Sequence, residues 1–143
     1  LRALNVHART TGRSDTRDAV VRAAELFLEH KLFRRLSNGI VIDPSFLQLH
    51  FPCYWHYDIL MALTVLAEAE MLDDERCVEA LEVLESKQLP DGGFPAEAKF
   101  YRVSPSTNAN GRSLVRWGPT SRKQSNEWVS CAALSVLAAA GRR

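Results

Sequence analysis

The sequence has few of the features that identify a function directly. It contains no glycine-rich phosphate loop, nucleophile elbow or dinucleotide-binding fingerprint. No apolar run approaches the roughly 20 residues that span a bilayer, and residues 1–4 do not begin a signal peptide. Cys53, Cys77 and Cys131 are odd in number and far apart. We therefore expect no disulfide framework, a cytoplasmic location, and buried structural thiols at Cys77 and Cys131.

The chain also lacks a dominant sign of charge. Its formal net charge of +1 gives no general attraction to nucleic acid or to a membrane surface. Residues 58–97 nevertheless hold eleven acidic and two basic residues, whereas residues 98–126 hold no acidic residue. The basic residues of this second segment are Lys99, Arg102, Arg112, Arg116, Arg122 and Lys123. We expect a basic loop after an acidic region, and no nucleic-acid binding, because no recognition motif accompanies the cations.

The first part of the chain predicts an arm and an amphipathic helix. Residues 1–13 show no hydrophobic period and are interpreted as an N-terminal arm. Residues 14–33 have one apolar and one charged face, which is typical of a helix that covers a core. Ser14 or Asp15 is the expected N-cap of this helix.

Two further helices are predicted to be buried on all sides. One is expected to begin near Cys53 or Tyr54, and between residues 59 and 67 its only polar residue is Thr64. The other is expected from about Ser125 to Gly141 and is almost as apolar.

An amphipathic helix and a long loop separate the two apolar helices. Asp73 is the expected cap of this helix, and Pro90 prevents its continuation. Residues 94–124 carry no clear period and predict a loop of unusual length.

The predicted helices repeat in pairs. Residues 62–67 match residues 133–138 at an offset of 71, and residues 22–25 match residues 79–82 at an offset of 57. The order is therefore amphipathic, buried, amphipathic, buried. An inner layer of buried helices covered by an outer layer of amphipathic helices suits this pattern. The predicted fold class is all-α.

A turn motif between the third and fourth predicted helices carries a resemblance. The motif consists of Gln88, Asp91, Gly92, Gly93 and Phe94. It resembles the Gln-x-x-x-Gly-Gly-aromatic repeat of the terpenoid cyclase and protein prenyltransferase superfamily, whose members are α/α toroids. From the residues themselves we expect glycines with unusual backbone angles, a side-chain turn at Asp91, backbone hydrogen bonding by Gln88, and packing of Phe94 between outer helices.

The resemblance implies a partial α/α toroid of about two outer/inner helix pairs joined by long loops. The pairs would be residues 14–72 and 73–143, and only Gly39 matches the motif in the first pair. The chain is similar to the C-terminal part of uncharacterised bacterial proteins of this superfamily. It begins without methionine. We therefore expect it to belong to a longer chain or to pair with copies of itself, because a partial ring exposes apolar faces.

In this superfamily the cavity is lined from the ends of the inner helices, which suggests site residues here. His56, Asp58 and Glu127 are the candidate catalytic acid and base groups. The candidate substrate-binding residues are Tyr54, Trp55, Tyr57, Asn126 and Trp128. A structural alternative stays open, in which Asp58 and Glu127 complement helix N-termini while Tyr57 and Trp128 belong to the core.

No metal site is predicted. Protein prenyltransferases bind zinc through an aspartate, a nearby cysteine and a distant histidine. The aspartates and cysteine of this chain that are close in sequence are Asp73, Asp74 and Cys77, and they lie at the start of a predicted outer helix. Cys53 and His56 have a ligand-like spacing on a predicted helix face, and His50 joins them only if its loop folds back. Neither zinc nor magnesium is therefore expected as a cofactor.

The basic loop has several interpretations. Arg112, Arg116, Arg122 and Lys123 could bind a diphosphate, which suits an isoprenoid substrate, or another anion. They could also pair with the acidic helix over residues 74–85. This last interpretation is favoured, because surface charges usually have no ligand.

Two functions follow as hypotheses. The chain is either part of a protein that binds or transforms an isoprenoid or other apolar molecule, or a non-catalytic helical-repeat scaffold that has lost the chemistry. The sequence does not decide whether the protein is an enzyme.

Overall fold

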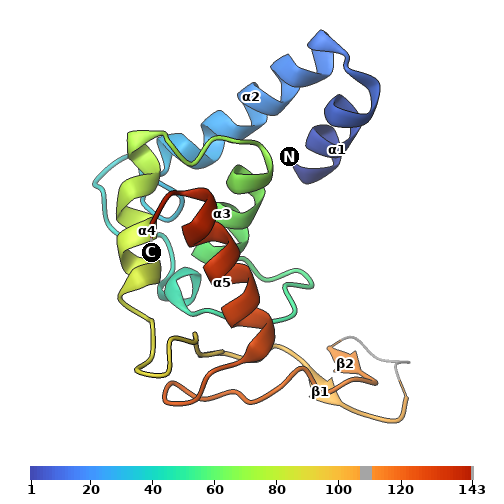
Figure 1. The fold of residues 1–143 in the computed structure, drawn as a ribbon, viewed down its shortest axis with the longest axis vertical. Helices are drawn as coiled ribbons and strands as arrows, with labels where there is room; N and C mark the ends of the chain where they lie inside the picture. The colour runs from blue at the N-terminus through green and yellow to red at the C-terminus, as the bar shows by residue number, and fades with distance from the viewer. Residues whose placement is uncertain (107–110, 143) are drawn as a thin grey trace.

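The chain folds as a mainly helical domain. A computed structural model describes residues 1–106 and 111–142 (Figure 1). In order along the chain, its elements are α1 (Arg2–Thr11), α2 (Ser14–Glu29), a 3-10 helix η1 (Pro44–Leu47), α3 (Ile59–Glu68), a 3-10 helix η2 (Glu75–Cys77), α4 (Val78–Glu85), β1 (Arg102–Val103), β2 (Arg112–Ser113) and α5 (Glu127–Ala139). None of the described helices is both long and apolar enough to cross a membrane.

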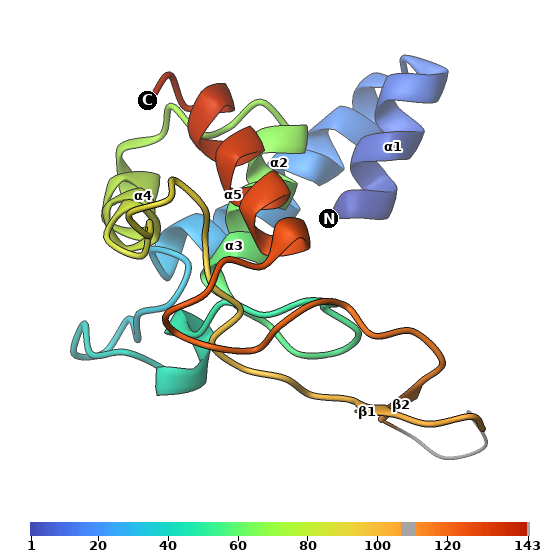
Figure 2. The same cartoon turned by 60° about the horizontal axis from the view of Figure 1, so that its bottom comes forward.

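Helix α3 lies at the centre of the core. Its apolar residues are buried around most of its circumference, as its sequence predicts. Helix α5 packs beside it, while α4 and the pair α1 and α2 cover other sides (Figures 1 and 2). The described helices form a layered arrangement around α3 and no closed ring, so the toroid stays a prediction.

The ends of α3 and α5 have the same backbone geometry at an offset of 71. Glu70 and Gly141 both have positive φ angles, 59° and 66°, directly after the helix C-caps. The next residue donates a backbone hydrogen bond back into the helix in both cases: Met71 N to Leu66 O at 3.0 Å, and Arg142 N to Leu137 O at 2.9 Å. These are the bonds of a Schellman ending, and each bond in one helix lies 71 residues from its counterpart.

The turn after α4 has the roles expected from its sequence. The backbone of Gly92 has a φ angle of 81°, which glycine adopts without strain. Asp91 Oδ1 accepts the Gly93 N–H at 2.9 Å in a side-chain turn, as predicted. Gln88 Nε2 donates to Gly92 O at 3.0 Å, so it satisfies a backbone group of the turn itself.

The same turn is fastened to α5. A Cβ at Gly93 would lie 2.5 Å from Ser125 Cβ, so only glycine fits there. Phe94 N–H donates to Ser130 Oγ at 2.7 Å, and Phe94 O accepts the Asn126 N–H at 2.8 Å. The Phe94 ring is fully buried in the core. The motif therefore fixes the start of α5 against the turn that follows α4.

Residues 2–11, interpreted from the sequence as part of an N-terminal arm without a period, form helix α1. Arg2 pairs with the Glu68 carboxylate, and Asn5 Nδ2 donates to Glu68 O at 2.6 Å. Ala8 and Asn5 are the buried residues of α1. Polar contacts to the end of α3 help to hold this helix in place. Such contacts leave no apolar stripe in the sequence, so the helix was not predicted.

Several predicted helix boundaries are also corrected. Helix α3 begins at Ile59 and not near Cys53, since Asp58 caps it by accepting the Met61 N–H at 2.7 Å. Asp74, and not Asp73, caps the turn before α4. Helix α2 begins at Ser14 without a side-chain cap. Helix α4 ends at Glu85, before Pro90 is reached.

Helix α5 is buried on one side only, which corrects the expectation of complete burial. Leu134 keeps 48% of its surface exposed and Trp128 keeps 47%. Cys131 is exposed as well, so it is not the buried structural thiol that was expected, whereas Cys77 is fully buried. The sequence of α5 predicts a partner on a face that is uncovered in this chain.

The predicted loop over residues 94–124 is largely irregular, and its residues 107–110 lie outside the described part. It contains the short strands β1 and β2, which pair in parallel with Arg102 opposite Arg112. Figure 2 shows this pair projecting away from the helices. Of the predicted cations, Arg102 and Arg112 therefore lie on this projecting pair.

Candidate functional site

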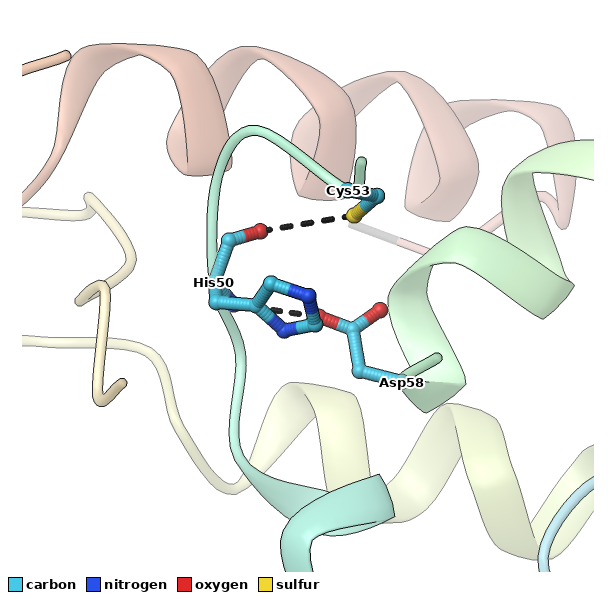
Figure 3. Close-up of side chains that lie close together, drawn as sticks. All are labelled: His50, Cys53 and Asp58. Carbon is cyan, nitrogen blue, oxygen red and sulfur yellow. Dashed lines mark hydrogen bonds and ion pairs between the residues drawn. The ribbon is translucent and has the colours of Figure 1, made fainter. Parts of the chain in front are cut away.

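A buried polar cluster lies in the loop between η1 and α3 (Figure 3). His50 Nδ1 lies 2.9 Å from Asp58 Oδ2, with the two side chains 1% and 0% exposed. The backbone N–H of His50 donates to the same oxygen at 3.0 Å, while Asp58 Oδ1 accepts the Met61 N–H. The carboxylate that caps α3 therefore also holds His50 in place.

These contacts fix the role of each His50 nitrogen. Nδ1 faces two acceptors, Asp58 Oδ2 and Gln48 O at 3.3 Å, so Nδ1 carries a hydrogen. Nε2 is buried and has no hydrogen-bond partner. Burial lowers the pKa of His50, but the hydrogen bond to Asp58 and the nearby Cys53 outweigh burial and raise the pKa to about 10.

A second histidine lies close by in the same loop. The His56 ring stacks on Phe100 with centroids 3.7 Å apart, and it meets the His50 ring nearly at a right angle with centroids 6.2 Å apart. His56 Nδ1 is also buried without a partner. Within the described parts of the chain, these two imidazole nitrogens are the only buried side-chain nitrogen or oxygen atoms without a hydrogen bond. Such groups are costly and therefore rare.

Cys53 completes the cluster. Its Sγ and one ligand atom each from His50 and Asp58 all lie within 4.8 Å of one another. The thiol donates to His50 O over 3.6 Å, which is a weak bond, and the residue is only partly buried. From the sequence, we expected His50 to join Cys53 only if the loop between them folded back. In the structure, the loop brings His50 close to Cys53.

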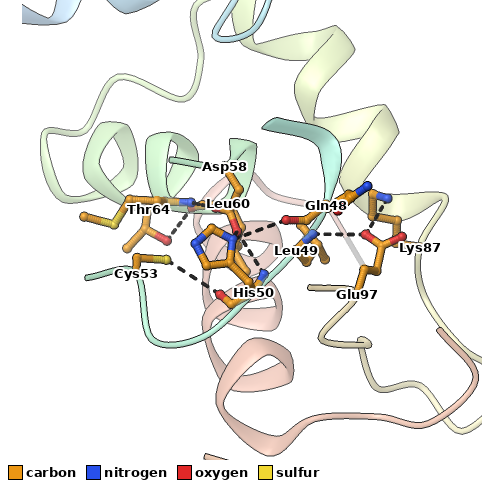
Figure 4. Close-up of polar contacts among 10 residues, drawn as sticks. Gln48, Leu49, His50, Cys53, Asp58, Leu60, Thr64, Lys87 and Glu97 are labelled. Atoms are coloured by element: carbon orange, nitrogen blue, oxygen red, sulfur yellow. Dashed lines mark hydrogen bonds and ion pairs between the residues drawn. The ribbon is translucent and has the colours of Figure 1, made fainter. Parts of the chain in front are cut away.

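A second set of polar contacts joins the loop of this cluster to the residues on either side of the turn motif (Figure 4). Glu97 Oε2 accepts the Leu49 N–H at 3.0 Å and pairs with Lys87 Nζ at 2.7 Å. The Lys87 and Glu97 side chains are only 16% and 11% exposed. The loop before α3 and the segment after α4 are therefore held together directly beside His50.

Aromatic rings gather at the N-terminal end of α5. Phe51 stacks on Trp128 with centroids 5.2 Å apart, and Trp117 contacts both rings edge-on at 5.4 and 5.3 Å. Trp128 remains half exposed. Tyr54 and Trp55 stack on each other and are also largely exposed. Three of the predicted substrate-binding aromatics, Tyr54, Trp55 and Trp128, thus remain accessible to solvent.

Tyr57 differs from the other predicted aromatics. Its hydroxyl donates to Leu32 O, and its ring packs edge-on against Phe46 with centroids 4.7 Å apart. Burial raises the pKa of Tyr57 well above its ordinary value. The ring also lines an apolar pocket of about 250 Å³ between α1 and α3, which Phe27 and Met61 share.

The two predicted site residues at the start of α5 have separate positions. Asn126 is buried, caps α5 through Oδ1, and donates from Nδ2 to Trp117 O at 2.8 Å and Pro119 O at 3.0 Å. Glu127 is exposed in the first turn. Across residues 1–106 and 111–142, no hydrogen bond or ion pair joins Glu127 to His56.

The cations of the basic loop do not pair with the acidic helix, which makes the favoured interpretation wrong. Three acidic residues between 74 and 85 are paired with arginines outside the basic loop: Asp74 with Arg76, Glu79 with Arg34, and Glu85 with Arg142. Arg122 lies 4.0 Å from Glu97. In the described part of the chain, Arg112, Arg116 and Lys123 have no ion pair.

Comparison with protein-family models, with curated proteins and with solved structures found no match. The toroid resemblance and the function that it implies therefore remain proposals, and they are argued from this chain's own residues.

Proposed function

We propose that the chain is a two-repeat segment of an α/α-toroid-like helical protein that binds an isoprenoid or similar apolar molecule at its loop end. The half-exposed ring of Trp128, supported by Phe51 and Trp117, is the observation that carries this proposal. An exposed ring held in one orientation loses little entropy when an apolar chain packs on it.

The unpaired cations favour a ligand with an anionic end. Arg116 adjoins Trp117 in sequence, and Arg112 lies on the strand that precedes it. Guanidinium groups bind phosphate oxygens in bidentate fashion, and no carboxylate competes for these two among the residues described. A prenyl diphosphate combines an apolar chain, which suits the aromatic rings, with an anion, which suits the arginines.

The proposal assigns unequal roles to the three predicted catalytic residues. Both carboxylate oxygens of Asp58 accept hydrogen bonds and the residue is fully buried, so it acts as a positioning residue. His56 and Glu127 remain the candidate acid and base, and a substrate must bring them into use together.

The test is a thermal-shift and turnover screen of the protein with prenyl diphosphates, with and without zinc or magnesium. Inorganic diphosphate is the control that separates anion binding from binding of the apolar chain. A rise in melting temperature with the prenyl compound alone supports the proposal. No shift and no turnover with any prenyl compound would contradict it.

The alternative is a non-catalytic helical-repeat scaffold, and the exposed face of α5 favours it. Leu60 and Leu63 of α3 are 4% and 0% exposed. Their counterparts 71 residues later are Cys131, which is exposed, and Leu134, which is 48% exposed. The repeat therefore predicts another helix over this face of α5, from further repeats or from a second copy.

A further inference from the structure

We propose that His50, Cys53 and His56 bind one divalent transition-metal ion of the zinc class, with Asp58 as a positioning residue. Isoprenoid binding is not a premise of this proposal. It explains why the two unpartnered buried nitrogens of the described chain belong to neighbouring histidine rings. A metal ion is a partner that both nitrogens lack.

The His50 ring is already oriented as a ligand. Its Nδ1–H is held by Asp58 Oδ2 and Gln48 O, so a metal ion would bind at Nε2 in place of the proton on that nitrogen. Figures 3 and 4 show this second edge of the ring turned to the side on which Cys53 lies. Histidines that bind metals commonly donate their other ring N–H to a carboxylate, which fixes both the tautomer and the ring orientation.

Cys53 supplies a second ligand and a path for entry. Its Sγ belongs to the group of ligand atoms within 4.8 Å of one another, and only a weak bond to His50 O restrains it. The residue is partly exposed, so an ion can reach the thiolate from solvent. Sulfur and imidazole donors favour zinc over magnesium or calcium.

His56 is assigned as the third ligand, a role that replaces its candidacy as a catalytic acid or base. His50, Cys53 and His56 follow one another at intervals of three residues in an irregular loop. His56 lies outside the compact group, with its ring centroid 6.2 Å from that of His50, so closure requires the loop to draw it inward. Three protein ligands leave a fourth position for water, which is the arrangement of catalytic zinc sites.

The test is a metal titration of the chelator-treated protein with Zn²⁺ and with Co²⁺ as its spectroscopic substitute. We expect one ion per chain and a thiolate-to-cobalt charge-transfer band. Cys53→Ser removes the band and weakens zinc binding at least tenfold, and His56→Ala also weakens it. The controls Cys131→Ser and His7→Ala alter residues outside the cluster and leave binding unchanged.

A second readout separates a ligand from a free thiol and does not depend on mutation. Zinc should slow alkylation of Cys53 at least tenfold while alkylation of exposed Cys131 proceeds at its own rate. Because Cys53 is only partly buried, we expect Cys53→Ser to keep the fold, and circular dichroism of the variant and the wild type checks this. No stoichiometric zinc binding, or equal binding by wild type and Cys53→Ser, would overturn the proposal.

Discussion

Asp58 links the helix framework to the candidate site, because its two oxygens serve different parts of the structure. One caps α3 through Met61 and the other holds His50 by two contacts. Asp58→Ala leaves buried donors without acceptors. We expect a loss of about 3 kcal/mol in the free energy of unfolding, from the cap and the buried hydrogen bonds together. Urea denaturation measures it.

Asp58→Asn is the matched control for this change, because its amide oxygen can still cap the helix. We expect it to lose less stability than Asp58→Ala. A loss below about 1 kcal/mol for the alanine variant would contradict the dual role, since it would be no more than an ordinary cap.

The two glycines of the turn motif are required for different reasons, and this is testable at single residues. Gly93→Ala places a Cβ 2.5 Å from Ser125 Cβ, so we expect overpacking to cost about 2–3 kcal/mol. Gly92→Ala meets open space but has to adopt a φ angle of 81°. Its expected cost is about 1–2 kcal/mol. Thermal unfolding of the two variants would contradict the account if their order were reversed.

At the scale of elements, an ion pair joins the turn after α2 to α4. Arg34 Nε lies 2.8 and 2.9 Å from the Glu79 carboxylate oxygens, and its hydrogen bonds lower the pKa of Glu79 below the ordinary value. A lowered folded-state pKa stabilises the fold above the unfolded pKa, and this stabilisation is lost as the pH falls through the folded-state pKa.

The Glu79→Gln variant tests that link. Since both side chains are about one third exposed, we expect a loss of no more than about 1 kcal/mol at neutral pH. The difference from wild type should shrink toward zero in acid, where Glu79 is protonated. Denaturation at several pH values measures it, and a constant difference across the acid range would contradict the role of the charge.

The elements differ in how far sequence could predict them. The apolar runs of α3 and α5 and the stripe of α2 predicted those helices, because burial leaves a periodic signal. Helix α1 was missed because polar contacts to Glu68 hold it. The start of α3 was placed too early, since the aromatic residues 54–57 continue the apolar run although they pack in a loop.

The candidate site was less predictable than the helices. Asp58 could be recognised as a site or capping residue from its place before an apolar run. His50 could not, because its contact with Asp58 depends on the path of the loop between them. Long-range loop geometry leaves no periodic trace, so the pairing of His50, Cys53 and Asp58 became visible only in three dimensions.

At the scale of the whole molecule, the uncovered face of α5 predicts association. Leu134 exposes apolar surface that its counterpart Leu63 in α3 buries, and Trp128 on the same helix is also half exposed. We expect this chain to self-associate with increasing concentration in sedimentation experiments. Leu134→Lys should weaken the association, whereas Val6→Lys on the exposed side of α1 should not. A monomer at all concentrations would contradict this prediction.

The central claim is that the aromatic loop end binds an apolar molecule with an anionic end. Calorimetric titration of the protein with a prenyl diphosphate at several temperatures tests it most directly. The account predicts binding with a negative heat-capacity change from apolar burial, weakened at least tenfold by Trp128→Ala and unchanged by Val6→Ala. Absence of binding, or equal binding by the Trp128→Ala variant, would contradict it.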